Sequence, residues 1–213
     1  AKSIGNYAFR GTAALTEVSL PALETIGSLV FDGSSITEID LPATVTSVAE
    51  QAFAGAKGLT SITVDEGNAL YLSENGVLYR NTGSYNYVTL VAYPEGKTDT
   101  VFDWSDSSLR VIRIGAYAFA NNPYLESITL PVHVRVIGAA AFYGCTALSR
   151  IEFLSATAPT LESYAYPVSQ NGEVTSENVY NNFKTEIGKE HGITIVVPAN
   201  NTGYDLYIWQ QYF

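Results

Sequence analysis

The side chains that most often carry out chemistry are few and scattered in this 213-residue chain. His133 and His191 stand without another histidine or a cysteine at metal-ligand spacing, so we expect both to be surface residues. Cys145 is the one cysteine, which excludes an internal disulfide, and we expect it to be buried as a small apolar residue. No G-x-S-x-G elbow marks a nucleophilic serine.

Two acidic segments contain residue types found in catalytic or calcium-binding sites, but not in the arrangement that such sites need. Glu38 and Asp40 could flank a glycosidic bond as acid and base, but we expect them on one flat strand face without a cleft. Residues 103–106, Asp-Trp-Ser-Asp, lack the spaced oxygens and terminal glutamate of a calcium-binding EF-hand loop, so we expect them to cap a turn. The sequence thus predicts no catalytic residue, no metal site and no cofactor, and we expect a non-enzymatic protein.

An internal repeat organises the chain. Phe9, Phe31, Phe53, Phe119 and Phe142 are separated by 22, 22, 66 and 23 residues, and 66 is three times 22. A period of about 20 to 29 residues indicates stacked coils, because one unit cannot bury its apolar face alone. Since stacked strands lie about 4.8 Å apart, we expect the five rings to form a buried spine of structural core residues.

Each repeat has two halves. In the second half, apolar residues such as Ile36, Ile39 and Leu41 end on a period of two, which predicts a short strand with one buried face. In the first half, a small residue and a phenylalanine follow an isoleucine or valine, which we interpret as a helical or 3-10 turn. The fold class predicted is therefore a repeat solenoid of α/β type, with one strand and one such turn in each repeat of 22 to 23 residues.

A column of small residues follows the phenylalanines by two positions. Its members are Gly11, Gly33, Gly55, Asn121 and Gly144. Glycine and asparagine enter the left-handed backbone region at little cost, so the column is expected to close each turn at positive φ.

The pattern L-x-x-I-x-L-P followed by I-G-x-x-A-F-x-G-C resembles the BspA-like leucine-rich repeat of bacterial surface proteins. Gly144-Cys145 reproduces the family's Gly-Cys step, whereas Thr12, Ser34, Ala56 and Asn122 replace the cysteine elsewhere. The resemblance covers residues 2–153 directly, with the departures of Ala49 for glycine and a missing proline after Val64. It implies a right-handed leucine-rich-repeat solenoid in an extracellular or surface-anchored protein of a host-associated bacterium. Adhesion or protein binding is the usual proposal for such proteins, without an established catalytic activity.

We predict a single domain over residues 1–213, with repeats at about 1–65 and 109–154. A β-hairpin or meander island is expected at about 66–108, because Asn75-Gly76 and Asn81-Thr82-Gly83 are turn signals between β-forming residues. We expect its tyrosines to be exposed and consider them candidates for a contact surface; they are Tyr71, Tyr79, Tyr85, Tyr87 and Tyr93.

The carboxyl-terminal segment, about 155–213, is expected to cap the solenoid, because the last coil would otherwise expose its apolar edge. We expect Trp209 and Phe213 to pack there. A sugar-stacking platform made by Trp209, Tyr207 and Tyr204 is the alternative.

A candidate partner-binding surface follows from the strand pattern. The residues that flank the central buried position of each strand face outward and form a polar, partly acidic ribbon; they are Glu17, Ser19, Glu38, Asp40, Ser61, Thr63, Ser127, Thr129, Arg150 and Glu152. An ordinary solvated sheet face is the alternative interpretation.

Composition narrows the partners. The net charge of −10, from 21 acidic and 11 basic residues, disfavours nucleic acid and anionic membranes. No apolar run is long enough for a transmembrane segment. The chain contains no methionine and begins halfway into a repeat, so we expect that a leader or further repeats precede it.

Three functions remain open at this level. The first is a non-enzymatic cell-surface or secreted protein that binds a protein or extracellular-matrix partner, with adhesion as its role. The second is carbohydrate binding by exposed aromatic residues. The third is a structural spacer that displays another domain.

Overall fold

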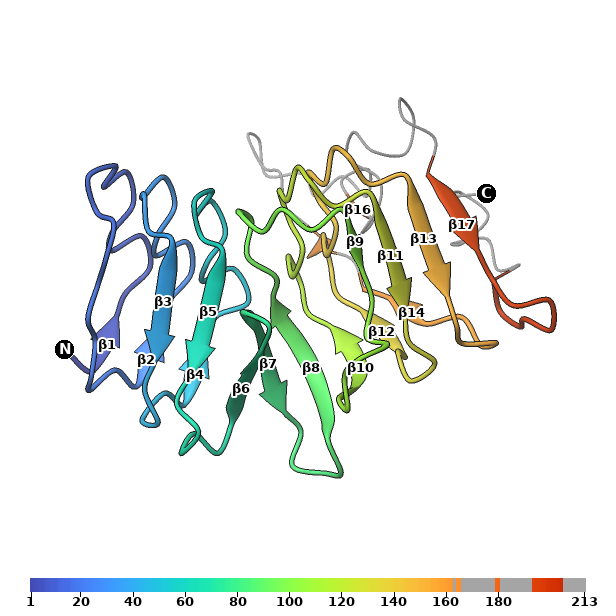
Figure 1. Cartoon of the computed structure of the whole chain (residues 1–213), viewed down its shortest axis with the longest axis horizontal. Helices are drawn as coiled ribbons and strands as arrows, with labels where there is room; N and C mark the ends of the chain where they lie inside the picture. Colours follow the sequence, from blue (N-terminus) through green and yellow to red (C-terminus); the bar gives the residue numbers. More distant parts are fainter. Residues whose placement is uncertain (163, 166–178, 181–192, 205–213) are drawn as a thin grey trace.

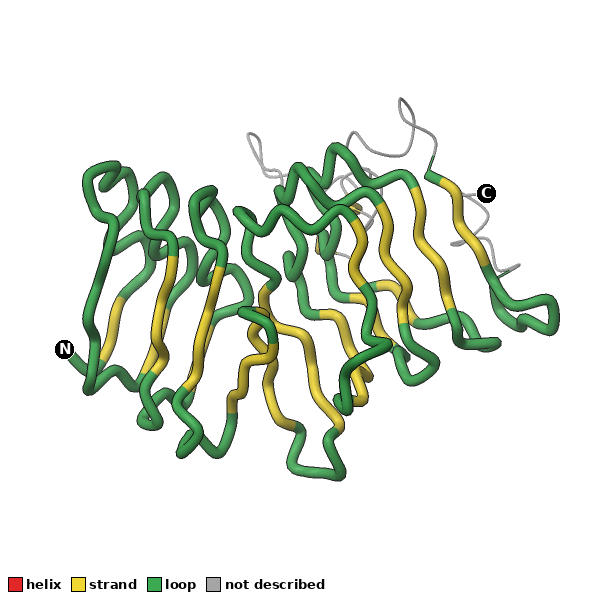
Figure 2. The backbone as a smooth tube through the Cα atoms, in the orientation of Figure 1, coloured by secondary structure: helices red, strands yellow, loops and turns green. Residues whose placement is uncertain are grey.

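The computed structural model describes residues 1–162, 164–165, 179–180 and 193–204. Coils of chain stack along the long axis of the molecule, from the amino terminus to the last described strand (Figure 1). This confirms the repeat solenoid. Each coil contributes a strand to one or both of two strand layers, and loops and turns join them (Figure 2).

One layer contains a three-stranded sheet, β1-β2-β4, and a six-stranded sheet, β14-β12-β10-β8-β7-β6. Its strands are β1 (Ser3–Ile4), β2 (Thr25–Ile26), β4 (Ser47–Val48), β6 (Tyr71–Glu74), β7 (Val77–Asn81), β8 (Tyr87–Ala92), β10 (Arg110–Ile114), β12 (Val136–Ile137) and β14 (Thr160–Leu161). Within the repeats the pairing is parallel, as between β2 and β4. Equivalent positions in successive coils therefore lie side by side.

The other layer contains a two-stranded sheet, β3-β5, and a four-stranded sheet, β17-β13-β11-β9. Its strands are β3 (Glu38–Leu41), β5 (Ser61–Val64), β9 (Val101–Phe102), β11 (Ser127–Leu130), β13 (Arg150–Phe153) and β17 (Thr194–Val196). We call the outer surface of this layer the strand face. A separate antiparallel pair joins β15 (Tyr164–Ala165) to β16 (Val179–Tyr180).

The expected helical or 3-10 turn is wrong: the structure has no helix within the described ranges, and the first half of each coil is a series of turns. The backbone N–H groups there alternate: every second one donates to the next coil, whereas those between them, such as Ala118 N–H to Gly115 O, close short turns within their own segment. Phe9 N–H donates to Val30 O at 2.9 Å, and Phe119 N–H donates to Ala141 O at 2.8 Å. A residue two positions before the phenylalanine, such as Leu29 or Tyr117, also has positive φ, which interrupts a right-handed helix.

The small-residue column lies in the left-handed region, as its composition predicts. The φ angles are 72° at Gly11, 69° at Gly33, 82° at Gly55, 63° at Asn121 and 71° at Gly144. A residue with a Cβ atom is strained in this region, and asparagine tolerates it better than most. The column therefore closes each coil at one place.

The phenylalanine spine runs through the interior. Phe31, Phe119 and Phe142 are fully buried, Phe53 is 5% exposed, and Phe9 is half-buried in the first coil. Ring centroids of successive members are 5.6 Å apart for Phe9 and Phe31, 6.2 Å for Phe31 and Phe53, and 5.1 Å for Phe119 and Phe142. These near-parallel rings bury large apolar areas and add favourable aromatic contacts.

Tyr93 supplies a further ring of the spine. Its N–H donates to Ala118 O at 2.7 Å, just as Phe119 N–H donates to the residue before Phe142. Its ring stacks on Phe119 with centroids 5.0 Å apart. The segment that leaves the island has thus become a coil of the solenoid with tyrosine in the phenylalanine position.

The island is a meander of three antiparallel strands, β6, β7 and β8, and β8 then pairs in parallel with β10. Side chains of β7 and β8 alternate between two hydrophobic clusters. Leu78 and Val91 belong to the amino-terminal cluster, whereas Tyr79 and Leu90 belong to the carboxyl-terminal one. The meander is therefore a buried partition between two cores.

This partition corrects the expected exposure of the island tyrosines. Tyr71, Tyr79 and Tyr93 are 4%, 1% and 3% exposed, so the rings of these three tyrosines do not form the exposed contact surface that was expected. Tyr87 is half-buried, and Tyr85 is 87% exposed. A strand that is covered on both faces of its sheet buries the side chains that point to either face. A tyrosine on such a strand belongs to the core even though its hydroxyl group is polar.

A carboxylate bridges the gap that the island leaves in the coil-to-coil hydrogen bonding. Glu95, 5% exposed, stands two residues after Tyr93, where the other coils have glycine or asparagine. Its Oε1 accepts from Gly55 N–H at 2.6 Å and from Asn121 Nδ2 at 3.1 Å. In the second coil, the equivalent Gly33 N–H donates to a backbone carbonyl, that of Gly55. The Glu95 carboxylate therefore accepts the hydrogen bond that a backbone carbonyl accepts where the coils follow one another without an island.

The Glu95 bridge makes stability depend on pH. Burial raises the pKa of Glu95 above its ordinary value, and Oε2 has no hydrogen-bond partner among the described residues. The native state thus holds a proton that the unfolded chain releases above about pH 4.5, and stability falls as the pH rises through the raised pKa. We expect Glu95→Gln to remove this pH-dependent loss of stability. The free energy of unfolding of the variant, compared with that of the wild-type chain, should therefore rise as the pH rises. Urea unfolding at several pH values checks this, and a constant difference would contradict it.

The carboxyl-terminal region continues the strand layer. Strand β17 pairs in parallel with β13, and Thr157 forms a bridge with Thr202. The Tyr204 hydroxyl donates to Ser155 O at 3.0 Å, and its ring packs edge-on against Phe153 at 5.4 Å. The predicted capping residues Trp209 and Phe213 lie outside the described residues.

Candidate functional site

In four of the five repeats the outward columns of the strand face lie on strands, as the period of two predicts, whereas Glu17 and Ser19 of the first repeat lie in a segment without a strand. Parallel pairing sets Glu38 beside Ser61 and Asp40 beside Thr63 in β3 and β5. It likewise sets Ser127 beside Arg150 and Thr129 beside Glu152 in β11 and β13. All of these side chains are exposed or half-exposed, while the positions between them, such as Ile39 and Ile128, are buried. The structure thus brings the predicted residues together in two ribbons.

The ribbons are separated by the island. Strands β5 and β9 do not pair, and the turn between β6 and β7 fills the interval on this layer: Ile62 N–H donates to Gly76 O at 2.9 Å, and Val64 N–H donates to Ser73 Oγ at 3.0 Å. The strand face is consequently two surfaces, one formed by the first three coils and one formed by β9, β11, β13 and β17.

The first surface is hollowed. A groove with a volume of about 670 Å³ crosses the first three coils, and we call it the acidic groove. Its charged lining residues are Glu17, Glu38, Asp40 and Asp65, and none of its lining residues is a lysine or arginine. Ser19 and Thr63 also line the groove, and the Thr63 hydroxyl donates to Asp40 Oδ1. Four uncompensated negative charges in one groove favour a cationic partner.

The second surface differs in charge. Arg150 forms an ion pair with Glu152 at 3.0 Å, so its one cation is matched by a neighbouring anion on the same strand. Ser127 and Thr129 add no charge. An exposed ion pair of this kind contributes little to stability and carries no net charge. The acidic groove is therefore the part of the strand face with the stronger net charge.

The structure also places the residues that could have carried chemistry. His133 lies in the loop after β11, half-buried, with its ring edge-on to Tyr87 at 5.9 Å. Cys145 is fully buried, its thiol donates to Phe119 O at 3.0 Å, and burial raises its pKa to about 12, which makes it unreactive. Asp103 accepts hydrogen bonds from Ser105 N–H and Oγ at 2.9 and 2.7 Å, which lowers the pKa of Asp103 and matches a turn-capping role. His191 lies outside the described residues.

Neither a metal site nor a membrane span is found in the part of the chain that the structure describes. No three histidine, cysteine or carboxylate groups there converge to hold a metal ion. No helix there is long and apolar enough to cross a bilayer. Of the alternative sugar platform, Tyr204 is buried at 3% exposure and cannot stack on a ligand, whereas Tyr207 and Trp209 lie outside the described residues.

Sequence reasoning missed one feature of the site region. A second, smaller hollow lies where β5 and β9 fail to pair, and it is lined by residues from the β6–β7 turn and from the segment after β9. For residues 103–106 in this segment the sequence predicted only a turn-capping role. Nothing in the spacing indicates that Glu74 and Asp106, 32 residues apart, line the same cavity.

The comparisons with known proteins agree with this architecture. The model of the BspA type leucine rich repeat region matches residues 1–90 and 105–199, with six copies. A leucine-rich repeat protein from Eubacterium ventriosum is 29% identical, with a TM-score of 0.57, over 73% of this chain and 46% of that one. No curated protein matches the sequence.

Two further solved structures share the fold. A leucine rich cell surface protein from Faecalibacterium prausnitzii is 24% identical, with a TM-score of 0.54, over 74% of this chain and 53% of that one. The pneumococcal vaccine antigen PcpA is 18% identical, with a TM-score of 0.50, over 75% of this chain and 56% of that one. The match thus spans about half the length of each of these structures.

Proposed function

Because the chain belongs to the BspA-type leucine-rich repeat family, whose model matches residues 1–90 and 105–199, we propose that it is a non-enzymatic binding scaffold. It acts at the cell surface or after secretion, and it holds a protein or extracellular-matrix partner in an adhesive contact. The observation that carries the proposal is the acidic groove, with four carboxylates and no cation along its lining. The partner presents lysine or arginine side chains to it.

Rigid presentation supports this role. The carboxylates of Glu38 and Asp40 extend from β3, which pairs with β5 over four residues, so their spacing is set by the sheet. The buried side chains on the inner face, Ile39 and Leu41, anchor the same strand to the core. A pre-organised surface loses little conformational entropy on binding, which favours affinity.

The electrostatic part of the proposal predicts the effect of neutralising β3. The double variant Glu38→Gln and Asp40→Asn should slow association with a decalysine peptide about tenfold at low salt and weaken the salt dependence, because complementary charge acts mainly on the association rate. Biolayer interferometry at two salt concentrations measures both quantities.

A matched variant separates this effect from net charge alone. Thr25→Lys and Ser47→Lys change the net charge by the same two units, but they lie on β2 and β4 in the other strand layer. We expect this control to keep most of the wild-type association rate. If both double variants slow association equally, the acidic groove is not the contact surface.

A further inference from the structure

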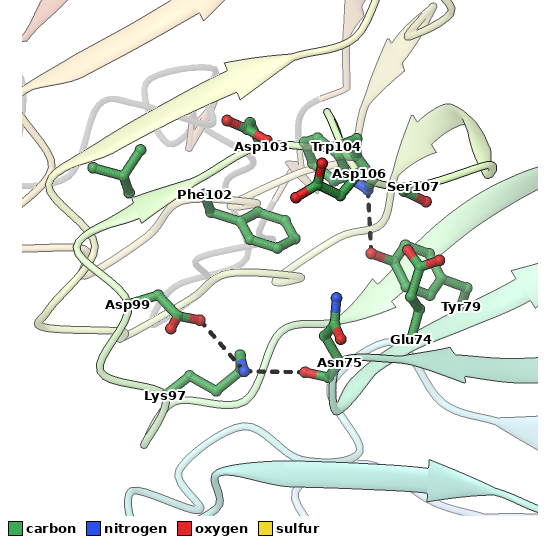
Figure 3. Close-up of a pocket in the computed structure, with 11 residues that line it drawn as sticks. Glu74, Asn75, Tyr79, Lys97, Asp99, Phe102, Asp103, Trp104, Asp106 and Ser107 are labelled. Atoms are coloured by element: carbon green, nitrogen blue, oxygen red, sulfur yellow. Dashed lines mark hydrogen bonds and ion pairs between the residues drawn. The ribbon is translucent and has the colours of Figure 1, made fainter.

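The cavity between the two parts of the strand face is assembled from three separate segments. We call it the junction cavity; its volume is about 310 Å³, at the lower end of the range for small-ligand sites. Glu74 and Asn75 come from the β6–β7 turn region and Tyr79 from β7, while Phe102, Trp104 and Asp106 come from β9 and the segment after it (Figure 3). It exists because the island interrupts the pairing of β5 with β9.

A buried hydroxyl group in this cavity has an unused proton. Trp104 Nε1–H donates to the Tyr79 hydroxyl oxygen at 3.1 Å, and the Tyr79 side chain is 1% exposed. The hydroxyl hydrogen of Tyr79 has no acceptor among the described residues, and burial raises its pKa, so the group stays protonated. A buried donor without an acceptor is costly. Since Tyr79 lines the cavity, a ligand that accepts this hydrogen bond would remove the cost.

Two carboxylates of the cavity are also without partners. Glu74 and Asp106 make no hydrogen bond or ion pair with any residue that the structure describes, and Figure 3 shows Glu74 near Tyr79 and Asp106 near Trp104. Phe102 adds a half-buried ring that packs edge-on against Trp104 at 4.7 Å. The cavity thus combines a fixed donor, two free acceptors and an aromatic surface.

This combination favours a neutral ligand with hydroxyl groups over a cation. The Lys97 ammonium group already occupies one side of the cavity, 3.0 Å from Asn75 O and 3.3 Å from Asp99 Oδ2. A guanidinium or ammonium ligand would lie close to Lys97 and, having donors only, would leave the Tyr79 proton unmatched. A hydroxyl group both donates and accepts, so one ligand can satisfy Tyr79 and the carboxylates together.

We propose that the junction cavity binds a single neutral pyranose ring, either as a free sugar or as the terminal residue of a glycan. Tyr79 donates to one sugar oxygen, Glu74 and Asp106 accept from neighbouring sugar hydroxyls, and the apolar face of the ring lies against Phe102. This activity is separate from the protein contact at the acidic groove, because the two hollows share no lining residue.

The Trp104 indole proton reports directly on the site, because it is bonded to the Tyr79 hydroxyl. The chain has two tryptophans, so a nitrogen–proton correlation spectrum contains two indole signals, and Trp209→Phe assigns the one from Trp104. We would titrate the methyl glycosides of glucose, galactose, mannose, fucose and N-acetylglucosamine separately. At least one is expected to shift the Trp104 signal in a saturable way below about 50 mM.

Variants test the assigned contacts. Tyr79→Phe removes only the buried hydroxyl, and Asp106→Ala removes an exposed carboxylate that the fold does not use, so the second variant remains informative if the first destabilises the core. Each should weaken the affinity for the active glycoside about tenfold, the usual effect of losing one good hydrogen bond to a ligand. Tyr204→Phe and Glu66→Ala are the matched controls outside the cavity, and both should bind as the wild-type chain does.

Further ligands distinguish a free sugar from a glycan terminus and test whether the proposal is wrong. An oligosaccharide that ends in the active sugar distinguishes a glycan terminus, which binds more tightly than the glycoside, from a single ring, which binds equally well. If no glycoside shifts the Trp104 signal, or if N-acetylarginine amide or calcium ion shifts it instead, the sugar assignment is wrong. Failure here would leave the decalysine result at the acidic groove unaffected.

Discussion

Replacing Phe119 with alanine should lower the free energy of unfolding by about 3 to 5 kcal/mol, the usual cost of truncating a buried phenylalanine. Phe119 is fully buried and packs on three aromatic neighbours, with ring centroids 5.0 Å from Tyr93, 5.1 Å from Phe142 and 5.9 Å from Phe102. It therefore joins the coil formed at the end of the island to the later repeats. Urea unfolding followed by circular dichroism gives the difference.

Phe9→Ala is the matched control for Phe119→Ala. Phe9 occupies the same position of its coil, but it is half-buried and stacks on one described ring, Phe31, at 5.6 Å. Because less apolar surface leaves water there, its truncation should cost clearly less. Equal costs at the two positions would show that stacking on both sides does not set the contribution of a ring to the spine.

Replacing Asn122 with alanine should cost about 3 to 5 kcal/mol as well, for a polar reason. Asn122 is fully buried, and its Nδ2 donates to the carbonyls of Pro94, Glu95 and Lys97 at 3.3, 3.1 and 2.9 Å. Its Oδ1 accepts from two backbone N–H groups of its own coil, those of Tyr124 and Leu125, at 2.9 and 2.8 Å. Alanine would leave these buried backbone groups unpaired.

Two further variants serve as comparisons for Asn122→Ala. Asn6→Ala removes one hydrogen bond, that from Ser28 N–H at 2.9 Å, at an exposed position, and should cost less than about 1 kcal/mol. Asn122→Asp keeps the acceptor but loses the donor to three carbonyls, so it should be nearly as damaging as alanine at neutral pH. If Asn122→Ala is as mild as Asn6→Ala, the asparagine does not fasten the island to the solenoid.

Much of the fold follows from the repeat. The phenylalanine spacing predicted stacked coils, and the small-residue column predicted positive φ at Gly11 and Asn121, where the angles are 72° and 63°. The apolar pattern also placed the strand columns, because side-chain direction on a strand depends only on a period of two. The prediction of a helical turn was wrong. In a segment such as Tyr117 to Ala120, long-range hydrogen bonds to the next coil outweigh the helix propensity of the residues.

The candidate site was predictable to a smaller extent. Glu38 and Asp40 were expected on the outer face of a strand, since they flank a buried isoleucine, and they line the acidic groove. The island tyrosines show the limit. Tyr79 and Tyr85 are six residues apart in similar turn-rich sequence, yet one is 1% and the other 87% exposed.

By itself, the sequence determined the period, the inward and outward faces of the strands and the turn positions that need glycine or asparagine. These depend on neighbours along the chain, whose geometry is local. Only the tertiary structure decided that Tyr93 enters the spine, that Glu95 reaches Gly55 and Asn121, and that Glu74 and Asp106 line one cavity. Such contacts depend on how the island is inserted between coils, and the register of segments far apart in sequence is set by packing, which no local pattern contains.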